Sequence, residues 1–412
     1  MTAVAGTSLG ADEPAVRDSG PSGEEAVAPN VLQVLPALSQ GGAERGAVDV
    51  AIAVAEAGGH SVVASEGGPL ERELSRAGVT HILLPLASKN PFTMRRNVSR
   101  LVDAIRGHRI AVVHARSRAP AWSARSAAQK AGAHFVTTFH GTYNFRNALK
   151  RRYNAIMTRG ERVIANSEFI AGHIRQHYRV EEARLRVIPR GIDMERFDPA
   201  KVPAGRIASL AGQWRLPDDV PLILMPGRLT RWKGQGLLLD ALAQLEGYEF
   251  WCALVGTPDG NEDYREELER KIDRLGLRGR TFLLDHCSDM PAAYMLADVV
   301  VSASTDPEAF GRVIAEAQAM GCPVVAADHG GAPEQVIRDR TAVLFRPKDA
   351  DDLAEGLRSA LELTSEDREV LAEEAIENVR AKFTKTGMCA ATLEVYRELT
   401  SGQGWGRTTL SA

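Results

Sequence analysis

The sequence predicts an α/β protein with two doubly wound parallel sheets that face a central cleft. Two series of short apolar segments, separated by helical stretches, run along the 412-residue chain, and a segment rich in Pro and Gly divides them. Alternation of strand and helix is typical of a parallel sheet wrapped by helices. Ligands of such sheets bind beyond the carboxyl ends of the strands, so the loops after strands are the first candidates for a site.

The expected strands are short apolar runs bounded by loops. The first series comprises Val31–Leu35, His60–Ala64, His81–Leu84, Ala111–His114, His134–Phe139, Arg162–Ala165 and Arg186–Ile188. The second series comprises Pro221–Met225, Phe250–Val255, Thr281–Leu284, Val299–Ser302, Pro323–Ala327 and Ala342–Phe345. A chain of this length is too long for one ordinary core, so each series is expected to form its own domain.

The domain boundaries follow from the same pattern. The expected organisation is a disordered tail (1–29), a first domain (30–196), a linker with a short helix (197–220), a second domain (221–385), a helix that packs back on the first domain (386–400) and a final tail (401–412). The first tail is rich in Ala, Gly, Glu, Ser and Pro and lacks the basic start and apolar block of a signal peptide.

Composition excludes several classes of function. The net charge of −3 gives no global basic field, so nucleic acid is not an expected partner. The cysteines are scattered at Cys252, Cys287, Cys322 and Cys389, without metal-ligand spacing, which is typical of reduced thiols in a cytoplasmic protein. No apolar run reaches the length of a transmembrane helix.

The segment from Pro307 to Glu316 is the most informative part of the chain. It follows the apolar run Val299–Ser302 and leads into a helix-forming stretch, which indicates strand, loop and helix. Glu308 falls in the loop, Gly311 allows a tight turn, and Glu316 lies a few residues into the helix. A helix start binds phosphate readily, so a diphosphate between two hydroxyl-rich rings suits this layout.

Two cations follow the first strand of the second domain. Arg228 and Lys233 lie between Gly227 and Gly234, at the end of the sheet where a ligand is expected. A guanidinium can grip an anion with two bonds, and an ammonium acts as a point charge. The alternative is that both are solvated surface side chains.

The first domain offers two loops in the equivalent place. Gly41 and Gly42 follow the first strand, but their spacing is not that of a dinucleotide-binding fingerprint. They allow backbone N–H groups to approach a phosphate or sugar, although a plain tight turn is the alternative. His140, next to Gly141, follows the strand that ends at Phe139, and no nearby carboxylate would orient it as in a catalytic triad.

Three further loops have structural alternatives. Ser167 or Asn166 is expected to cap a helix. Arg190 can add positive charge over the cleft. Gly330 to Glu334 repeats the strand, glycine and helix pattern, where Glu334 is either a helix-start charge or a ligand.

A metal site is not expected. Asp349 and Asp351 have a formal metal-ligand spacing, but their place at a helix start favours capping. The cations Arg228 and Lys233 and the helix start after Phe310 can neutralise a diphosphate without a divalent ion, and no cofactor is expected beyond a nucleotide-sugar co-substrate.

The stretch 94–106 is an amphipathic basic helix. Its apolar residues Met94, Val98, Leu101, Val102 and Ile105 share one face, and arginines lie elsewhere. It either packs on the core with a solvated basic side or contacts an anionic membrane surface.

Together these residues resemble the retaining glycosyltransferases of family 4, which have the GT-B fold of two Rossmann-like domains. The resemblance spans Val31 to about Leu399. Its most specific parts are Glu308…Glu316 with Phe310-Gly311 between them, Gly227-Arg228…Lys233-Gly234, Gly41-Gly42-Ala43-Glu44-Arg45 and Arg190-Gly191-Ile192-Asp193. Many relatives have Asn at the position of Arg190, so its contact is not transferred. The first domain also resembles that of bacterial lipopolysaccharide or envelope-glycan transferases through the basic helix and His140-Gly141-Thr142-Tyr143.

The resemblance implies a nucleotide-diphosphate sugar held by the second domain and a glycan or lipid-linked acceptor held by the first. It implies catalytic roles for His140, Glu308, Arg228 and Lys233, with His140 near the transferred sugar. It implies donor contacts from Gly41, Gly42, Arg228, Lys233, Glu308, Ala309, Phe310, Gly311, Arg312, Val313 and Glu316, of which Glu316 would hold the ribose hydroxyls. Such enzymes retain the anomeric configuration without an evident protein nucleophile.

Other classes remain open at this point. A sugar-nucleotide epimerase shares the two-domain architecture, and a non-catalytic binder of sugar nucleotides or glycans would bind without turnover. A dehydrogenase is disfavoured because the glycine fingerprint is absent. The sequence does not identify the base, the sugar, the acceptor, the linkage or the oligomeric state. The expected location is the cytoplasm, either free or at the inner face of the membrane.

Overall fold

A computed structural model describes residues 28–39, 41–143, 147–258 and 260–401. It contains two parallel sheets, each in its own domain, which confirms the expected α/β class. The first sheet has the strand order β3-β2-β1-β4-β5-β6-β7, and the second has the order β10-β9-β8-β11-β12-β13. In each sheet the order reverses direction beside its first strand, and a crevice at such a point is the usual ligand site.

The first sheet is formed by β1 (Val31–Val34), β2 (Ser61–Ser65), β3 (Thr80–Leu83), β4 (Val112–Ala115), β5 (His134–Phe139), β6 (Arg162–Ala165) and β7 (Leu185–Val187). Its helices are α1 (Gly42–Glu56), α2 (Glu71–Arg76), α3 (Pro91–Gly107), α4 (Arg118–Ala131), α5 (Ala148–Asn154) and α6 (Glu168–His177), with short 3₁₀ turns at Ala155–Thr158 and Glu182–Arg184.

The second sheet is formed by β8 (Leu222–Pro226), β9 (Trp251–Val255), β10 (Thr281–Leu284), β11 (Val299–Ser302), β12 (Val324–Ala327) and β13 (Ala342–Phe345). The remaining helices are α7 (Ala204–Trp214), α8 (Gln235–Leu242), α9 (Glu262–Arg274), α10 (Met290–Leu296), α11 (Arg312–Ala319), α12 (Ala350–Leu361), α13 (Ser365–Lys382) and α14 (Lys385–Thr400), with 3₁₀ turns at Pro199–Lys201 and Arg231–Lys233.

The expected strands are all present, with ends that differ by a residue at several places. Leu35, for example, lies beyond β1 but is only 2% exposed, because an apolar side chain continues into the core after the strand ends. His60 lies before β2, and its exposed ring stacks on His108. Helices cover both faces of each sheet, so the strands are nearly continuous apolar runs.

The expected linker, 197–220, is packed rather than extended. Phe197, Val202 and Leu210 are buried in the core of the second domain, and α7 lies against α10. The segment therefore belongs physically to the second domain. Of the first tail, residues 1–27 lie outside the described residues, whereas Ala28 is buried against the first domain. In the final tail only Ser401 is described, and it is exposed.

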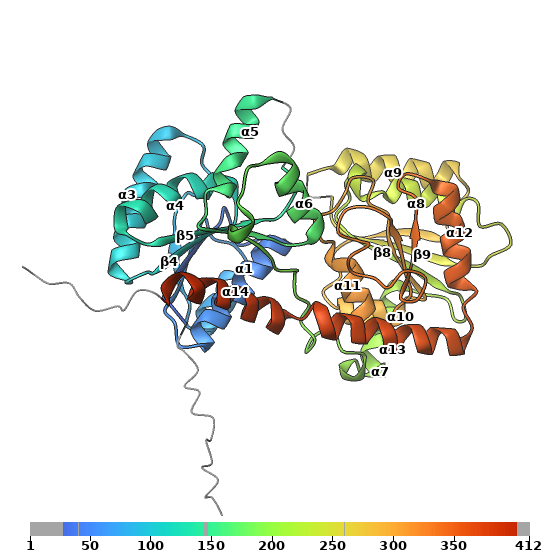
Figure 1. Ribbon diagram of the computed structural model, residues 1–412. Coiled ribbons are helices and arrows are strands. Elements are labelled where there is room, and N and C mark those ends of the chain that lie inside the picture. The colour runs from blue at the N-terminus through green and yellow to red at the C-terminus, as the bar shows by residue number, and fades with distance from the viewer. Residues whose placement is uncertain (1–27, 40, 144–146, 259, 402–412) are drawn as a thin grey trace, which may run out of the picture.

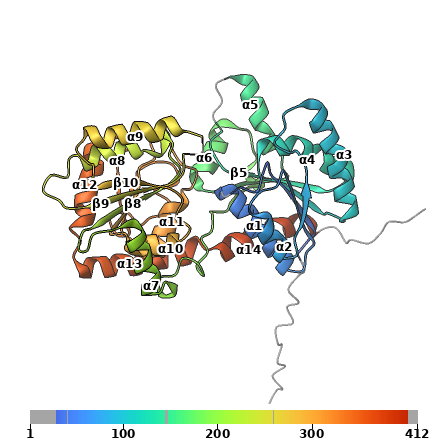
Figure 2. The same cartoon turned by 180° about the vertical axis from the view of Figure 1, so that it is seen from behind.

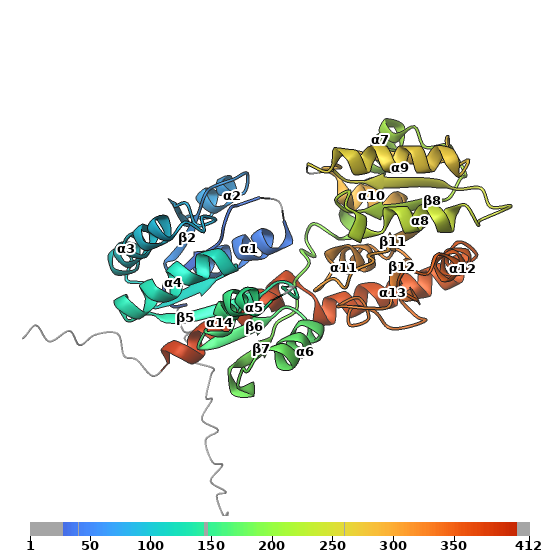
Figure 3. The same ribbon diagram turned by 90° about the horizontal axis from the view of Figure 1, so that it is seen from above.

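The chain crosses between the domains twice, and the two crossings pair with each other. The Ile192 amide donates to the Phe383 carbonyl at 2.7 Å, and the Lys385 amide donates to the Ile192 carbonyl at 2.8 Å. A Cβ at Gly191 would lie 2.4 Å from the Lys385 Cα, so only glycine permits this approach. Figure 3 shows the two domains side by side, with α1, α6 and α11 at their boundary.

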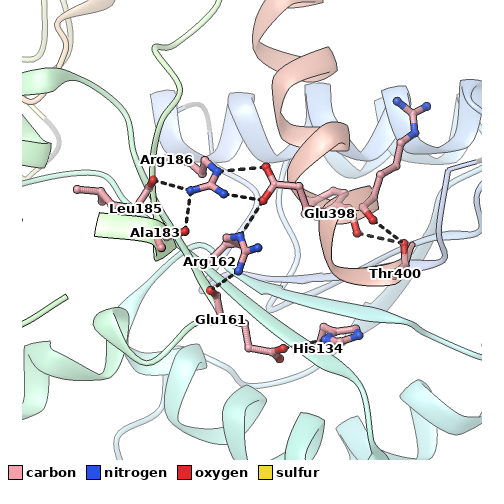
Figure 4. A network of polar contacts seen from close by, with 10 residues as sticks. His134, Glu161, Arg162, Ala183, Leu185, Arg186, Glu398 and Thr400 are labelled. Carbon is pink, nitrogen blue, oxygen red and sulfur yellow. Dashed lines mark hydrogen bonds and ion pairs between the residues drawn. The ribbon is translucent and has the colours of Figure 1, made fainter. Parts of the chain in front are cut away.

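The C-terminal helix returns to the first domain, as expected. Figures 1 and 2 show α13 running beneath the second domain and α14 continuing beneath the first. Tyr396 and Leu393 of α14 are buried in a cluster with Val50 and Val54 of α1. Near the end of α14, Glu398 accepts hydrogen bonds from Arg162 and Arg186 on adjacent strands (Figure 4).

Candidate functional site

The loop between β11 and α11 forms the centre of the candidate site. Gly311 has a φ of 80°, in the left-handed region, and α11 begins directly after it at Arg312. A residue with a Cβ is disfavoured at such a φ, which explains the glycine. Glu308 lies before the turn, and Glu316 is the fifth residue of the helix, as the sequence predicted. The backbone N–H groups of the first turn of α11 follow Glu308 and precede Glu316 along the chain.

Glu308 is held by Lys233 from the loop after β8 and by Ser304 from its own loop. Lys233 Nζ lies 2.7 Å from Glu308 Oε1, and the Ser304 hydroxyl donates to the same oxygen. Both ends of the ion pair are largely buried, each side chain being 16% exposed. A small pocket beside Glu308 is lined by Ser304, Gly311 and His329 among others. Lys233 and Glu308, both predicted to bind the nucleotide-sugar donor, therefore contact each other beside this pocket at the start of α11.

Glu316 is held by one residue from its own helix and one from α10. Arg312 lies 2.8 Å from Glu316 Oε1, and the Tyr294 hydroxyl donates to Glu316 Oε2 at 3.0 Å. Tyr294 is fully buried, and burial together with the Glu316 carboxylate raises its pKa well above the ordinary value. Tyr294 therefore stays protonated and serves as a fixed donor to Glu316.

The residues around the turn pack either on the core of the second domain or on that of the first domain across the boundary. Phe310 is 3% exposed, and its ring packs edge-on against Phe383. Val313 also packs on the second-domain core, while Ala309 packs on the core of the first domain. The side chains of Phe310 and Val313 therefore have a structural role. Only their backbone groups remain as predicted contacts with the nucleotide-sugar donor.

Buried amide side chains form a hydrogen-bond network that supports this loop. The Gln335 side-chain amide donates to the backbone carbonyls of Phe310 and Gly331. The Gln335 backbone carbonyl accepts from the side chains of Gln318 at 2.7 Å and Asn378 at 2.8 Å. These bonds fix the turn before α11. The sequence analysis did not identify Gln335, because a buried glutamine has no local pattern.

Arg228 lies on the loop after β8 and is exposed. Its carbonyl accepts a hydrogen bond from Gln235 at 2.9 Å, which fixes the backbone of the loop. Lys233 belongs to a 3₁₀ turn later in the same loop, and its ammonium lies 4.7 Å from the centre of the Trp232 ring. The loop thus places both predicted phosphate contacts at the carboxyl end of β8.

The first domain contributes Gly41, Gly42 and the start of α1. The Arg190 guanidinium donates to the Gly42 carbonyl, and a Cβ at Gly42 would lie 3.5 Å from the Arg312 Cδ of the second domain. Gly41 is the N-cap residue of α1, at the same corner. The glycine loop of one domain therefore lies directly against the α11 start of the other.

His140 lies at the same boundary, at the end of β5. Arg190 donates from its second terminal nitrogen to His140 Nδ1 at 3.0 Å. Burial, Arg190 and Arg116 lower the pKa of His140 well below its ordinary value. His140 Nε2 is buried and has no hydrogen-bond partner among the described residues. The sequence analysis expected no orienting group for this histidine beside it, and the structure supplies one from a distant loop.

Glu334 has a different place from the one its sequence context predicted. No helix follows Gly331; residues 331–336 form turns instead. The Glu334 carboxylate crosses to the first domain and accepts from the backbone N–H groups of Glu168, at 2.7 Å, and Phe169. Ser167 caps the same helix by accepting from Ile170, as expected. Glu334 is therefore an interdomain cap on α6.

The aspartates considered for metal have a structural role. Asp349 caps α12 by accepting from the amides of Asp351 and Asp352. Within the described ranges, no group of three or more His, Cys, Asp or Glu side chains gathers as metal ligands would. The expectation of a metal-independent site remains a prediction.

Comparisons with known proteins identify the family of this chain. Residues 40–196 match the family described as "Glycosyltransferase Family 4", and residues 208–378 match "Glycosyl transferases group 1". A crystal structure of a glycosyltransferase from Rickettsia africae is 35% identical, covers 91% of this chain and all of its own (100%), and has a TM-score of 0.86. The chain belongs to glycosyltransferase family 4. Its two parallel-sheet domains are those of the GT-B fold.

Other proteins to which this chain is similar have more specific names. Anabaena HepE, solved in complex with UDP and glucose, is 26% identical, with a TM-score of 0.79 over 89% of this chain and 98% of its own. The D-inositol 3-phosphate glycosyltransferase of Xylanimonas cellulosilytica is 33% identical over 251 residues, which cover 58% of this family 4 chain. The matched segment spans 59% of that relative's length.

Among the described residues, no helix of this family 4 protein is both long and apolar enough to cross a membrane.

Proposed function

We propose that the protein transfers a hexose-type sugar from a nucleotide-diphosphate sugar to a glycan or lipid-linked acceptor, with retention of configuration. The observation that carries this proposal is the pair of carboxylate contacts on either side of the α11 start. Glu308 is paired with Lys233 before the turn, and Glu316 is paired with Arg312 after it. A diphosphate bound at the helix start would have a sugar ring on the Glu308 side and a ribose on the Glu316 side.

The charges of this site suit a diphosphate without a metal ion. Arg228, Lys233 and the N–H groups of α11 are positive groups at one end of the sheet, and Arg190 and Arg312 approach from the domain boundary. Such donors stabilise the charge that develops on the leaving phosphate. The leaving phosphate can then take the proton of the attacking hydroxyl on the same face of the sugar, so no protein base is required.

The acceptor is proposed to lie in the first domain, opposite the donor. Arg312 of the second domain approaches the first domain at Gly42, and Ala309 packs on the first-domain core, so an acceptor hydroxyl at this boundary would lie close to the transferred sugar. The names of the relatives suggest classes to test. One acceptor class to test is a phosphorylated cyclitol, which the name of the inositol-phosphate enzymes suggests. The second is a cell-envelope or lipopolysaccharide-type glycan, which the sequence resemblance suggests.

A membrane contact of the first domain is part of this proposal. Phe92 at the start of α3 and Leu149 at the start of α5 are 85% and 79% exposed. Both helix starts follow strands of a parallel sheet and so lie at its carboxyl edge, where the acceptor would bind. The exposed Arg95, Arg96 and Lys150 are next to them in sequence. Exposed apolar side chains among cations suit an anionic bilayer surface at the inner face of the membrane.

Vesicle co-sedimentation tests the membrane part separately. We expect the protein to sediment with anionic vesicles at low salt and to be released at high salt, because screening weakens such contacts. The double variant Phe92→Ser and Leu149→Ser should remove sedimentation, whereas Val370→Ser, at an exposed apolar position of α13, should not. Absence of binding at low salt would refute the membrane contact and leave the transferase proposal intact.

The transferase proposal is tested first by donor binding. A panel of nucleotide sugars, starting with UDP-sugars, should raise the melting temperature when the correct donor is present. Transfer is then measured with that donor and candidate acceptors. Glu316→Ala and Lys233→Ala should retain the fold and lose nearly all transfer. Unchanged turnover in both variants would overturn the assignment.

The same assay separates the alternative classes. An epimerase would convert the donor without any acceptor, and a binding protein would bind the donor without product. Product analysis with donor alone distinguishes the first, and turnover with acceptor excludes the second. Complete loss of turnover on addition of a chelator would contradict the metal-free mechanism alone.

A further inference from the structure

The contact between Arg190 and His140 determines which ring nitrogen of the histidine carries a proton. Arg190 donates to His140 Nδ1 at 3.0 Å. A guanidinium has only N–H donors and no acceptor atom. Nδ1 must therefore present its lone pair, and the proton of a neutral ring must sit on Nε2. Because Nε2 is buried without a partner among the described residues, its N–H bond is available to a ligand atom.

Arg190 is itself held in place. One terminal nitrogen donates to the Gly42 carbonyl and the other donates to His140, so the guanidinium connects the glycine loop to the histidine. Burial, Arg312 and Arg116 lower the pKa of Arg190 to about 10, which leaves it charged at neutral pH. The His140 amide also donates to the Tyr143 hydroxyl at 3.3 Å, which fixes the backbone at the same point.

We propose that Arg190 is a positioning residue that keeps the His140 ring neutral with its proton on Nε2, so that His140 donates a hydrogen bond to a substrate oxygen and serves as neither general acid nor general base. The oxygen belongs to a hydroxyl or phosphate group bound at the domain boundary. The identity of that substrate rests on the proposed function, but the state of the ring does not.

Burial and the neighbouring cations Arg190 and Arg116 favour the neutral form of the ring. A second proton on Nδ1 would face the Arg190 guanidinium directly and would break the existing hydrogen bond. The charged and titratable groups around the pair are Arg116 and His114 of the β4 end, Tyr143 of the β5 loop, Glu44 of α1 and Arg312 of α11. Glu44 is the acidic member of this set, and it interacts with Arg190.

The direct test is nitrogen NMR of the intact protein labelled at its histidines. Long-range proton–nitrogen correlations distinguish a protonated ring nitrogen from an unprotonated one, and the spectrum of His140→Gln assigns the signal. We expect Nδ1 unprotonated and Nε2 protonated from pH 5.5 to pH 8 in the unmodified protein. A proton on Nδ1, or titration of His140 within this range, would overturn the proposal whether or not a sugar is transferred.

Variants of Arg190 test the cause. In Arg190→Met, the ring should lose its fixed tautomer and take up a second proton with a midpoint nearer the ordinary histidine value of about 6.5. Arg190→Lys retains a donor and should restore the Nε2–H form. Arg118→Met is the matched control, since Arg118 is a nearby cation that lies over the Tyr143 ring at 4.3 Å. Arg118→Met should leave the tautomer of His140 unchanged. If Arg190→Met also left it unchanged, the proposed role of Arg190 would be contradicted.

Activity gives an independent readout once a donor is known. The transfer rate of the unmodified protein should show no pH dependence from His140. The rate of Arg190→Met should be lowest near pH 7.5, where part of the neutral ring carries its proton on Nδ1, and should recover toward pH 5.5, because a doubly protonated ring again has an N–H bond on Nε2. A purely structural loss would lower the rate equally at every pH. If no donor supports transfer, the proposed function fails while the NMR result still decides the tautomer.

Discussion

Lys233 Nζ lies 2.7 Å from Glu308 Oε1, in a site where both side chains are largely buried. Without a donor, the cation and the carboxylate neutralise each other. A bound diphosphate would draw the ammonium toward its oxygens and free Glu308 to accept from sugar hydroxyls. In the proposed donor complex, the pair would therefore connect phosphate binding to sugar binding.

The first prediction follows from this relationship. Lys233→Ala should lower kcat/KM by about 100-fold or more, because one preorganised charge on the leaving group is lost. The control is Arg231→Ala in the same turn, which removes an exposed ion pair with Glu267 and should change kcat/KM little. Transfer assays over a range of donor concentrations measure both. Equal effects of the two substitutions would contradict a specific role for Lys233.

The second prediction concerns Glu316, whose two oxygens are already engaged by Tyr294 and Arg312. A ribose would share or replace these contacts and donate its hydroxyls to the carboxylate. If the donor panel identifies a UDP-sugar, the unmodified protein should bind UDP about tenfold or more tightly than 2′-deoxy-UDP, the range of one hydrogen bond to a charged group. Glu316→Gln should lose most of this preference, as calorimetry with both nucleotides would show.

The control for this measurement is Glu308→Gln, on the sugar side of the helix start. It should retain the preference for the 2′-hydroxyl, because the nucleotides tested carry no sugar beyond the diphosphate. Loss of the preference in Glu308→Gln and its retention in Glu316→Gln would reverse the proposed orientation of the donor.

Much of this fold could be predicted from local sequence. Apolar runs identified all the strands, since buried parallel strands are apolar on both faces. The turn at Gly311 and the place of Glu316 in α11 also followed from local patterns, because their cause lies within a few residues. The caps at Ser167 and Asp349 are of the same kind.

The contacts that complete the site could not be predicted in this way. Arg190 lies 50 residues from His140, and Glu334 lies 166 residues from the amide of Glu168 that it caps. Such partners are chosen by the packing of the two domains, and a single sequence carries no pattern for them. Tyr294 and Gln335 were missed for the same reason: each is a buried polar residue whose partner lies on another element.

The third prediction concerns the attachment of α14 to the first domain. Glu398 accepts from Arg186 at 2.7 Å and from Arg162 at 2.8 Å, and hydrogen bonding to Arg186, with Arg162 also contributing, lowers the pKa of its carboxyl below the ordinary value. A carboxylate with a lowered pKa in the folded state stabilises the fold above its unfolded pKa, and this contribution is lost as the pH falls through the folded value.

Glu398→Gln should therefore lower the free energy of unfolding at pH 7 by about 1 kcal/mol, a modest value because the contacts are partly exposed to solvent. The difference from the unmodified protein should shrink as the pH falls below about 4.5, the ordinary glutamate value. Urea unfolding at several pH values measures it. A difference that is constant with pH would show that the lost stability does not come from ionised Glu398.

The fourth prediction concerns the closure of the two domains, which a contact of Glu334 across the domain boundary helps to hold together. Its carboxylate accepts from two backbone amides at the start of α6, where the helix dipole favours negative charge. Glu334→Ala leaves those amides without this partner and should allow the domains to separate more often. The radius of gyration of the ligand-free protein, measured by small-angle X-ray scattering, should increase.

Addition of the donor should restore the compact form of this variant, since Arg312 and the glycine loop would both contact the ligand across the boundary. The apparent affinity for the donor should fall, because closure then has to be driven by binding. Glu369→Ala, on α13, is a control that removes a carboxylate of the second domain at an exposed position and should leave the radius unchanged. If Glu334→Ala has the same radius and the same donor affinity as the unmodified protein, the Glu334 contact does not control closure, and the other contacts, among them the paired crossings at Ile192 and Lys385, hold the domains together.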